Sequence, residues 1–360
     1  MAALRPELDA AVARVLGSGW FILGPELEAF ERELAAALGA RDAVAVGNGT
    51  DALFLSLRAL GVGPGDDVVT SPVSAAFTAL AVLQAGARPV FVDVDPATLN
   101  LDPTKAEAAL TPRTKALLPV HLYGHPADMD PIVALARDRG LAVVEDACQA
   151  HGALYRGRPV GTLAGERGLG ALSFYPTKNL GALGDGGAIL VNEPDLAARL
   201  RQLRNGGQSG KYRHELPGVN SRLDEVQAAI LRVGLRHLPQ WTERRRALAE
   251  LYVAGLDGSG VETLREQPYA RAVHHLLVVR HPRRDALARA LGERGVGTLV
   301  HYPTPLHLQP VFASLGGQPG DLPVAERATR EVLSLPLYPE LRDEQARRVV
   351  EAVRDAARQV

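Results

Sequence analysis

Short apolar runs alternate with amphipathic stretches up to about residue 235. The runs have the length of buried strands and end in glycine, proline or aspartate, whereas the stretches between them have helical spacing. This alternation predicts a mostly parallel sheet covered by helices, with ligands at the carboxyl ends of the strands. The predicted strands are 43–46, 68–70, 89–92, 116–120, 141–144 and 188–191; the predicted helices are 51–60, 74–84, 130–139 and one that contains Leu27, Phe30, Leu34 and Leu38 and packs on the sheet.

The second part of the chain has a mixed pattern that begins near residue 240. We therefore expect a large α/β domain over residues 1–240 and a smaller α+β domain over residues 241–360. The elements predicted from residue 204 onward are a polar, glycine-rich loop at 204–218, helices at 222–235, 241–256, 285–294 and 343–357, and a strand at 275–279.

Composition narrows the class of protein. The 360 residues are 46% hydrophobic and carry 41 acidic and 40 basic side chains, which are interspersed along the chain. The sequence therefore shows no cluster of positive charge of the kind that binds nucleic acid or an anionic membrane. A single cysteine excludes an internal disulfide framework and fits a reducing compartment. Neither a signal-peptide core nor an apolar run of membrane length is present in the sequence, so we expect a cytoplasmic protein.

Lys178 stands out because lysine is scarce in this chain. Of the 40 cationic residues only four are lysines, so arginine supplies most of the positive charge. An amine can lose its proton and form an imine with an aldehyde, whereas a guanidinium cannot. Lys178 lies in the run Ser-Phe-Tyr-Pro-Thr-Lys-Asn-Leu-Gly of residues 173–181, which is apolar and rich in small residues. The pattern indicates amine chemistry rather than simple charge.

An acid, Asp146, follows the strand predicted at 141–144. By itself, an aspartate at a strand end is more often the cap of a turn. Together with an imine-forming lysine further along the chain, it suggests pyridoxal phosphate (PLP) held as a Schiff base. The carboxylate is then expected to pair with the pyridinium nitrogen and keep it protonated, so that the ring accepts electrons during transamination.

A glycine-rich turn at 47–51 follows another predicted strand and opens a helix. Free amides at a helix N-terminus bind phosphate, and Thr50 adds a hydroxyl, although the same residues also fit an ordinary N-cap. Ser173 is placed to direct its hydroxyl at the same phosphate, and Gln149 to contact the ring hydroxyl of the cofactor. Each of these two, taken alone, is more often a structural polar residue. Cys148 is expected to be a small buried filler.

Several motifs, in one order, resemble the nucleotide-sugar aminotransferases of the DegT/DnrJ/StrS family, which are fold-type I, aspartate aminotransferase-like PLP enzymes. The match runs almost from end to end, and the motifs together are far more specific than any one of them. The resemblance implies an α/β fold with a three-layer large domain around a mostly parallel central sheet and a smaller α+β C-terminal domain. The matching segments are 19–25, 47–53, 89–95, 145–152, 173–181, 218–227, 301–303 and 307–310.

The resemblance also implies roles for the catalytic pair and for the residue at the ring. Lys178 would form the Schiff base with PLP and then carry a proton between cofactor and substrate carbons. Asp146 would hold the pyridine nitrogen, and Gln149 the ring hydroxyl.

The phosphate would be bound by Thr50, Ser173 and the backbone of Gly49. In this family Asn220 reaches the phosphate from the neighbouring subunit, which implies a homodimer with shared active sites. Without the family, Asn220 fits equally well as a helix N-cap before residues 221–223.

The family implies transfer of an amino group from an amino acid, L-glutamate in our expectation, to a keto sugar linked to a nucleotide diphosphate. The run 173–187 most resembles the branch that acts on 3-keto-6-deoxyhexoses, often dTDP-linked; glutamine stays open as the donor. The candidate substrate-binding residues are Lys211 and Arg213 for the diphosphate and His301, Tyr302 and His307 for the sugar, each of which also fits a structural or solvated position.

One segment departs from the family pattern. Family members often place an aromatic ring against the cofactor in the stretch that matches residues 71–78, whereas this chain has small residues near Ala75. We therefore assign no ring-stacking residue and expect Phe77 to belong to the core.

Other functions compete with this one. An aminotransferase for a keto-cyclitol such as scyllo-inosose would have the same cofactor motifs. Family dehydratases replace the lysine by histidine, so Lys178 disfavours them. A non-catalytic regulator is the alternative from another class, but the sequence has no DNA-binding helix pair and no basic stripe.

Overall fold

The computed structural model of the chain describes residues 4–165 and 168–360; residues 1–3, 166 and 167 of the predicted first domain lie outside it. Within the described residues, seven strands form the central sheet: β1 (Asp42–Val46), β2 (Asp67–Thr70), β3 (Arg88–Phe91), β4 (Thr114–Leu118), β5 (Ala142–Asp146), β8 (Gly168–Ser173) and β9 (Gly187–Val191). Their order across the sheet is β1-β9-β8-β5-β4-β2-β3. Pairing is parallel from β3 across to β8, whereas β9 is antiparallel to both of its neighbours, so the mostly parallel sheet is confirmed.

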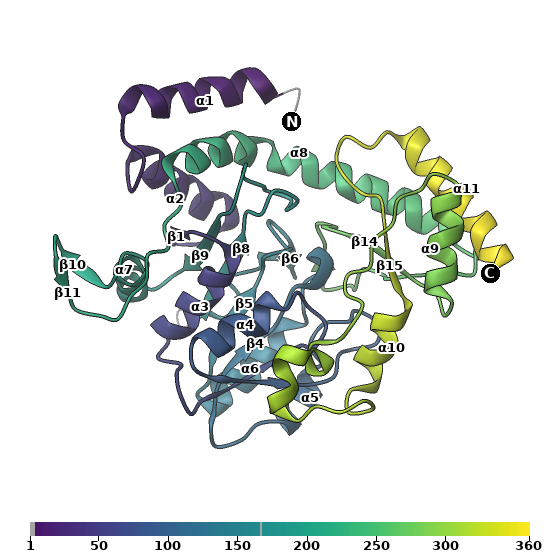
Figure 1. The fold of residues 1–360 in the computed structure, drawn as a ribbon, viewed down its shortest axis with the longest axis horizontal. Helices are drawn as coiled ribbons and strands as arrows, with labels where there is room; N and C mark the ends of the chain where they lie inside the picture. Colours follow the sequence, from purple (N-terminus) through teal and green to yellow (C-terminus); the bar gives the residue numbers. More distant parts are fainter. Residues whose placement is uncertain (1–3, 166–167) are drawn as a thin grey trace.

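Helices cover both faces of this sheet (Figure 1). Successive residues of a strand point to opposite faces, so Val143 packs with one layer and Val144 with the other. Strands buried on both faces are apolar throughout, which is why their runs were visible in the sequence. The helices up to residue 203 are α1 (Arg5–Ser18), α2 (Pro25–Leu38), α3 (Gly49–Ala59), α4 (Phe77–Gln84), α5 (Pro103–Ala108), α6 (Met129–Arg139) and α7 (Pro194–Leu203).

The two layers have different members. Apolar residues of α2 and α6 pack on one face of the sheet, and those of α3, α4 and α7 on the other. The predicted apolar face of α2 is confirmed, because Leu27, Phe30 and Leu34 are all buried in the first layer. The three-layer arrangement follows from these two cores with the sheet between them.

A single helix, α8 (Glu225–Leu256), replaces the two helices predicted at 222–235 and 241–256. Its first half packs with α2, and its second half packs with the C-terminal elements (Figure 1). Pro239 lies inside the helix and does not end it. The domain boundary predicted at residue 240 falls within α8, and the division into two domains stays a prediction.

The chain beyond α8 adds a small sheet in the order β12-β14-β15, with helices packed beside it. A hairpin of β10 and β11 projects within 204–218, where a loop was predicted, and short strands pair elsewhere in the order β13-β6-β7 (Figure 1). No described helix is long and apolar enough to cross a membrane. The remaining bounds are β6 (Leu154–Tyr155), β7 (Arg158–Pro159), β10 (Gln208–Gly210), β11 (Arg213–His214), β12 (Glu262–Thr263), β13 (Ala270–Arg271), β14 (Leu277–Arg280), α9 (Arg284–Glu293), α10 (Pro323–Glu331), β15 (Val332–Leu335) and α11 (Asp343–Gln359).

Candidate active site

A cavity of about 770 Å³ opens at the carboxyl ends of β5 and β8, beside the N-terminus of α3. This is the edge of the sheet where the alternating pattern predicts a ligand. Segments from the C-terminal part of the chain complete its wall. Of the candidate residues, the structure brings Gly49, Thr50, Asp146, Gln149, Ser173, Lys178, His301 and Tyr302 together around this cavity.

Lys178 follows β8 in a tight turn, and its amide donates to the carbonyl of Tyr175 at 2.8 Å. Burial lowers the pKa of its amine, because the charged form loses water, and the negative charge of Asp146 opposes this shift. A lowered pKa makes the unprotonated amine more accessible near neutral pH, as a nucleophile or a base requires. By contrast, burial raises the pKa of the Cys148 thiol well above its usual value, so the thiol stays protonated.

Asp146 is the last residue of β5, and only 5% of it is exposed. One carboxylate oxygen accepts a hydrogen bond from the hydroxyl of Thr78 at 2.7 Å, and the other accepts from the amide of Cys148 at 3.2 Å. Both oxygens are therefore held in place. Asp146 and Lys178 line the same cavity, which is the arrangement that a lysine-linked pyridoxal cofactor requires.

The first turn of α3 meets the end of β8. A Cβ built on Gly49 would lie 2.6 Å from Cβ of Ser173, so glycine is needed for this close approach. The helix is capped by Asn48, whose side chain accepts from the amide of Asp51 at 2.8 Å. Thr50 is therefore not the N-cap. The first-turn amides, the Thr50 hydroxyl and the Ser173 hydroxyl form a donor set that fits a phosphate group.

Gln149 connects the two halves of the cavity wall. Its side-chain oxygen accepts from the amide of Tyr123 at 2.6 Å, and its nitrogen donates to the hydroxyl of Tyr302 at 2.9 Å. The Tyr123 hydroxyl donates to the carbonyl of His301. Burial raises the pKa of Tyr302 to about 12, so its hydroxyl keeps its proton. Because Tyr302 accepts from Gln149, that proton is free to be donated to a ligand.

His275 lines the cavity, yet the sequence marked it only as the start of a predicted strand. Asn179 donates to the carbonyl of Val273 at 3.1 Å, which turns its oxygen toward Nδ1 of His275, 3.3 Å away. Nδ1 therefore carries the proton, and Nε2 is left as an acceptor. Burial, and next the charge of Lys178, hold the pKa of His275 well below its ordinary value. His275 follows a loop, and nothing in the local sequence marks it as a residue of the cavity.

Four candidate residues do not line this cavity within the described part of the chain. His307 is buried elsewhere, with Nε2 3.3 Å from the carboxylate of Glu326. Lys211 and Arg213 lie on the exposed hairpin, where Lys211 packs over the ring of Tyr212 and Arg213 pairs with Glu215 at 2.8 Å. Asn220 is exposed and forms a backbone bridge with Asn205.

Phe77 is not a core residue, so that expectation was wrong. It begins α4, its side chain is 62% exposed, and it lines the cavity together with Ala75. The buried side chains of α4 are those of Thr78, Ala79, Ala81 and Val82, so Phe77 lies outside the packed face of the helix. The small Ala75 leaves space beside it.

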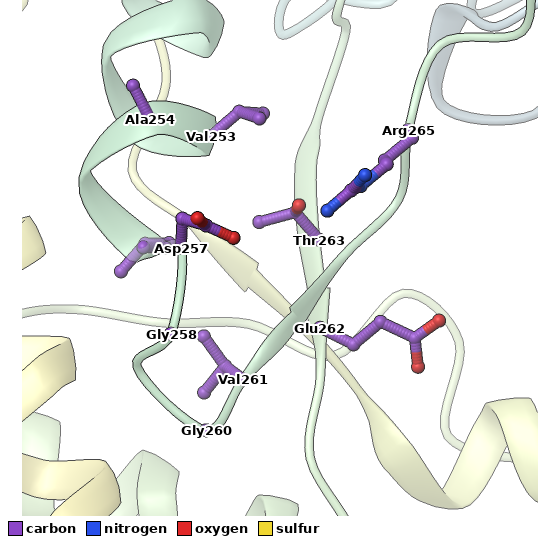
Figure 2. A pocket seen from close by; sticks show the side chains of 10 residues that line it. Val253, Ala254, Asp257, Gly258, Gly260, Val261, Glu262, Thr263 and Arg265 are labelled. Atoms are coloured by element: carbon purple, nitrogen blue, oxygen red, sulfur yellow. The ribbon is translucent and has the colours of Figure 1, made fainter.

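A second cavity of about 770 Å³ lies between the end of α8 and β12. Figure 2 shows the side chains of Asp257 and Arg265 directed into it from opposite sides. None of the candidate residues contributes to its wall. The second cavity therefore has no part in the chemistry predicted from the sequence.

Known proteins resemble this chain over its full length. The model of the DegT/DnrJ/EryC1/StrS aminotransferase family matches residues 3–354. A relative from Streptomyces venezuelae named dTDP-3-amino-3,4,6-trideoxy-alpha-D-glucose transaminase is 53% identical over 358 residues, which cover 99% of this chain and 94% of the relative.

Solved structures confirm the expected fold. The structure of S. venezuelae DesV in complex with a ketimine intermediate superimposes with a TM-score of 0.97 at 53% identity and covers 100% of this chain and 96% of that one. The structure of NtdA from Bacillus subtilis with bound cofactor PMP gives a TM-score of 0.92 at 34% identity and covers 100% of this chain and 83% of that one. Structural relatives are thus aminotransferases of this cofactor class.

Proposed function

Because the chain belongs to the DegT/DnrJ/EryC1/StrS aminotransferase family, we propose that it moves an amino group from L-glutamate to a nucleotide-diphosphate-linked keto sugar with PLP as its cofactor. The observation that carries the proposal is the meeting of a half-buried Lys178, whose amine has a lowered pKa, with Asp146 in one cavity. The chain is an aminotransferase by its family; the sugar, the donor and the cofactor are our inference.

The proposed acceptor is a dTDP-linked 3-keto-6-deoxyhexose. The name of the Streptomyces venezuelae relative describes a dTDP sugar that carries its amino group at carbon 3. The exchange balances, because the amino acid gives up its amino group and takes the carbonyl oxygen as a keto acid, while the sugar undergoes the reverse change.

The residues present fit PLP. Its phosphate would lie at the first turn of α3 against Thr50 and Ser173, its ring nitrogen against Asp146, and its ring hydroxyl against Gln149. When bound, PLP supplies an aldehyde for the amines and a ring that stabilises negative charge on the carbon that loses a proton.

Lys178 performs two tasks in this proposal. Its amine would hold the cofactor between turnovers, and once released it would take a proton from the donor carbon that carries the amino group and later deliver one to the sugar carbon that receives it. Burial supports both tasks, since it lowers the pKa of the amine. His301 and Tyr302 line the same cavity, and Tyr302 has a proton to donate to a sugar oxygen.

We propose further that the enzyme is a cytoplasmic homodimer whose active sites are shared. Asn220, Lys211 and Arg213 are exposed and lie away from the cavity of their own chain, which fits a place in the partner's cavity. Mixing the Lys178→Ala and Asn220→Ala proteins under subunit exchange tests this. Half of the dimers would combine the two chains, and each would regain one intact site, so activity should rise to about a quarter of the wild-type level. No rise on mixing would place Asn220 in its own subunit.

The function is tested by offering the PLP-loaded protein a panel of nucleotide-linked keto sugars together with glutamate and following amine formation by mass. The proposal expects an amino sugar at carbon 3 of a dTDP-linked substrate, and none with the Lys178→Ala variant. Amination of cyclitol ketones alone would support the keto-cyclitol alternative. A wild-type protein that converts neither class would contradict the proposed acceptor.

A further inference from the structure

The two oxygens of Asp146 are held by different partners, and one of them begins a chain of hydroxyls. Thr78 Oγ1 lies 2.7 Å from Oδ2 of Asp146 and 2.7 Å from Oγ of Ser74. An ionised carboxylate can only accept, so Thr78 donates its single proton to Asp146. Thr78 must then accept from Ser74. The direction of the chain is therefore fixed as Ser74 to Thr78 to Asp146.

The fold places these three residues together from two separate elements. Asp146 ends β5, whereas Thr78 is the second residue of α4 and Ser74 lies in the turn before that helix. All three line the cavity, and their exposed fractions are 3% for Ser74, 2% for Thr78 and 5% for Asp146. At this burial, water is a poor substitute for a lost hydroxyl, and an unpaired carboxylate oxygen is unfavourable.

We propose that Thr78 is a positioning residue for the cofactor acid: its hydroxyl, oriented by Ser74, fixes the rotation of the Asp146 carboxylate toward the ring nitrogen of PLP. This inference rests on the proposed function. The backbone amide of Cys148 holds the other oxygen at 3.2 Å, which is a longer and weaker contact. The side-chain hydroxyl is therefore the stronger of the two restraints.

Three variants separate this role from simple packing. Thr78→Val keeps the shape of the side chain and removes the hydroxyl, Thr78→Ser restores the hydroxyl, and Ser74→Ala removes the donor to Thr78. PLP affinity of the cofactor-free proteins is measured by equilibrium dialysis, and the visible absorbance of the loaded proteins is titrated with pH. We expect Thr78→Val to bind PLP roughly ten- to a hundredfold more weakly. Its absorbance transition should move to higher pH, because a less positive ring withdraws fewer electrons from the imine.

Thr78→Ser should bind PLP and titrate like the wild type, and Ser74→Ala should change in the same direction as Thr78→Val by a smaller factor. If Thr78→Val binds PLP as tightly as the wild type with an unchanged absorbance transition, the positioning role is wrong. If Thr78→Val does not fold, an unchanged affinity in Ser74→Ala overturns the hydroxyl chain. A wild-type protein that binds no PLP removes the proposed function and this inference together, so the two failures are distinguishable.

Discussion

His151 makes the stability of the folded chain sensitive to acid. Its ring is fully buried against Phe174, and in the described part of the chain neither ring nitrogen has a hydrogen-bond partner. Burial, and next the positive charge of Lys178, lower the pKa of His151 to about 3. A contact with the backbone of Ser173 favours the charged imidazole, but the loss of water and the charge of Lys178 outweigh it.

Proton linkage decides whether acid stabilises or destabilises the folded chain. In the unfolded chain a histidine titrates near its ordinary pKa of about 6.5. Below that pH the imidazole of His151 is protonated in the unfolded state, whereas in the folded state it stays neutral down to about pH 3. Stability is therefore present above pH 6.5 and is lost as the pH falls toward 3. Between pH 7 and pH 5 His151 alone should reduce the free energy of unfolding by about 2 kcal/mol.

Replacing His151 with leucine isolates this contribution. Urea unfolding of wild type and His151→Leu at equal protein and cofactor concentrations is compared at pH 5, 6, 7, 7.5 and 8.5. The difference between the two free energies should change by about 2 kcal/mol in favour of the variant from pH 7 to pH 5. The difference should stay constant from pH 7.5 to 8.5, where the imidazole is neutral in both states. Any effect of repacking around leucine is the same at every pH and therefore cancels when the difference at pH 5 is compared with that at pH 7. A difference that is the same at pH 5 and pH 7 would refute the buried, neutral histidine.

Two further predictions concern the scaffold and are measured by urea unfolding at pH 7.5. Glu225→Ala should reduce the free energy of unfolding by about 3 kcal/mol. The Glu225 carboxylate accepts hydrogen bonds from three amides at the start of α2, those of Gly24, Glu26 and Leu27, and without it these buried or partly buried amides are unpaired. A change below about 1 kcal/mol would contradict this role. Gly170→Ala should reduce the free energy of unfolding by about 3 kcal/mol or more, since the new Cβ would lie 2.3 Å from the carbonyl oxygen of Gly161. The control Gly292→Ala in α9, where a Cβ would have nothing within 4 Å, should leave this free energy unchanged or raise it. Equal effects of the two alanines would contradict the steric argument.

The sheet was predictable where its strands are continuous apolar runs. β8 was missed because Gly168 and Gly170 interrupt its pattern. The structure shows why residue 170 is glycine: a Cβ at this position would collide with the backbone of Gly161. Such a contact between distant segments has no signature in the local sequence.

The two helices predicted at 222–235 and 241–256 are one helix, because tertiary packing outweighs the local preference of the chain between them. Pro239 lacks an amide proton and disfavours a helix interior. On either side of it, Leu238 packs into the core of the sheet and Leu248 into the core of the C-terminal part. Tertiary packing at both ends thus maintains one helix.

The candidate site was predictable as far as its chemistry is visible in single residues. Lys178, one of four lysines in the chain, and Asp146, an acid at a strand end, were proposed as a pair from residue type and position, and the structure brings both to one cavity. Thr78 could have been suspected from its i,i+4 spacing with Ser74, but its donation to Asp146 depends on how α4 meets β5. His275 gave no signal, because its tautomer is set by Asn179 from another segment.

The link between Lys178 and PLP is tested by loading the purified protein with PLP, reducing it with borohydride and mapping the modified peptide by mass. We expect one stable phosphopyridoxyl adduct, on Lys178, and loss of the visible absorbance on reduction. The Lys178→Ala protein should bind PLP without an adduct. An adduct on Lys105, Lys115 or Lys211 in place of Lys178, or none at all in a protein that still aminates a keto sugar, would contradict the assignment.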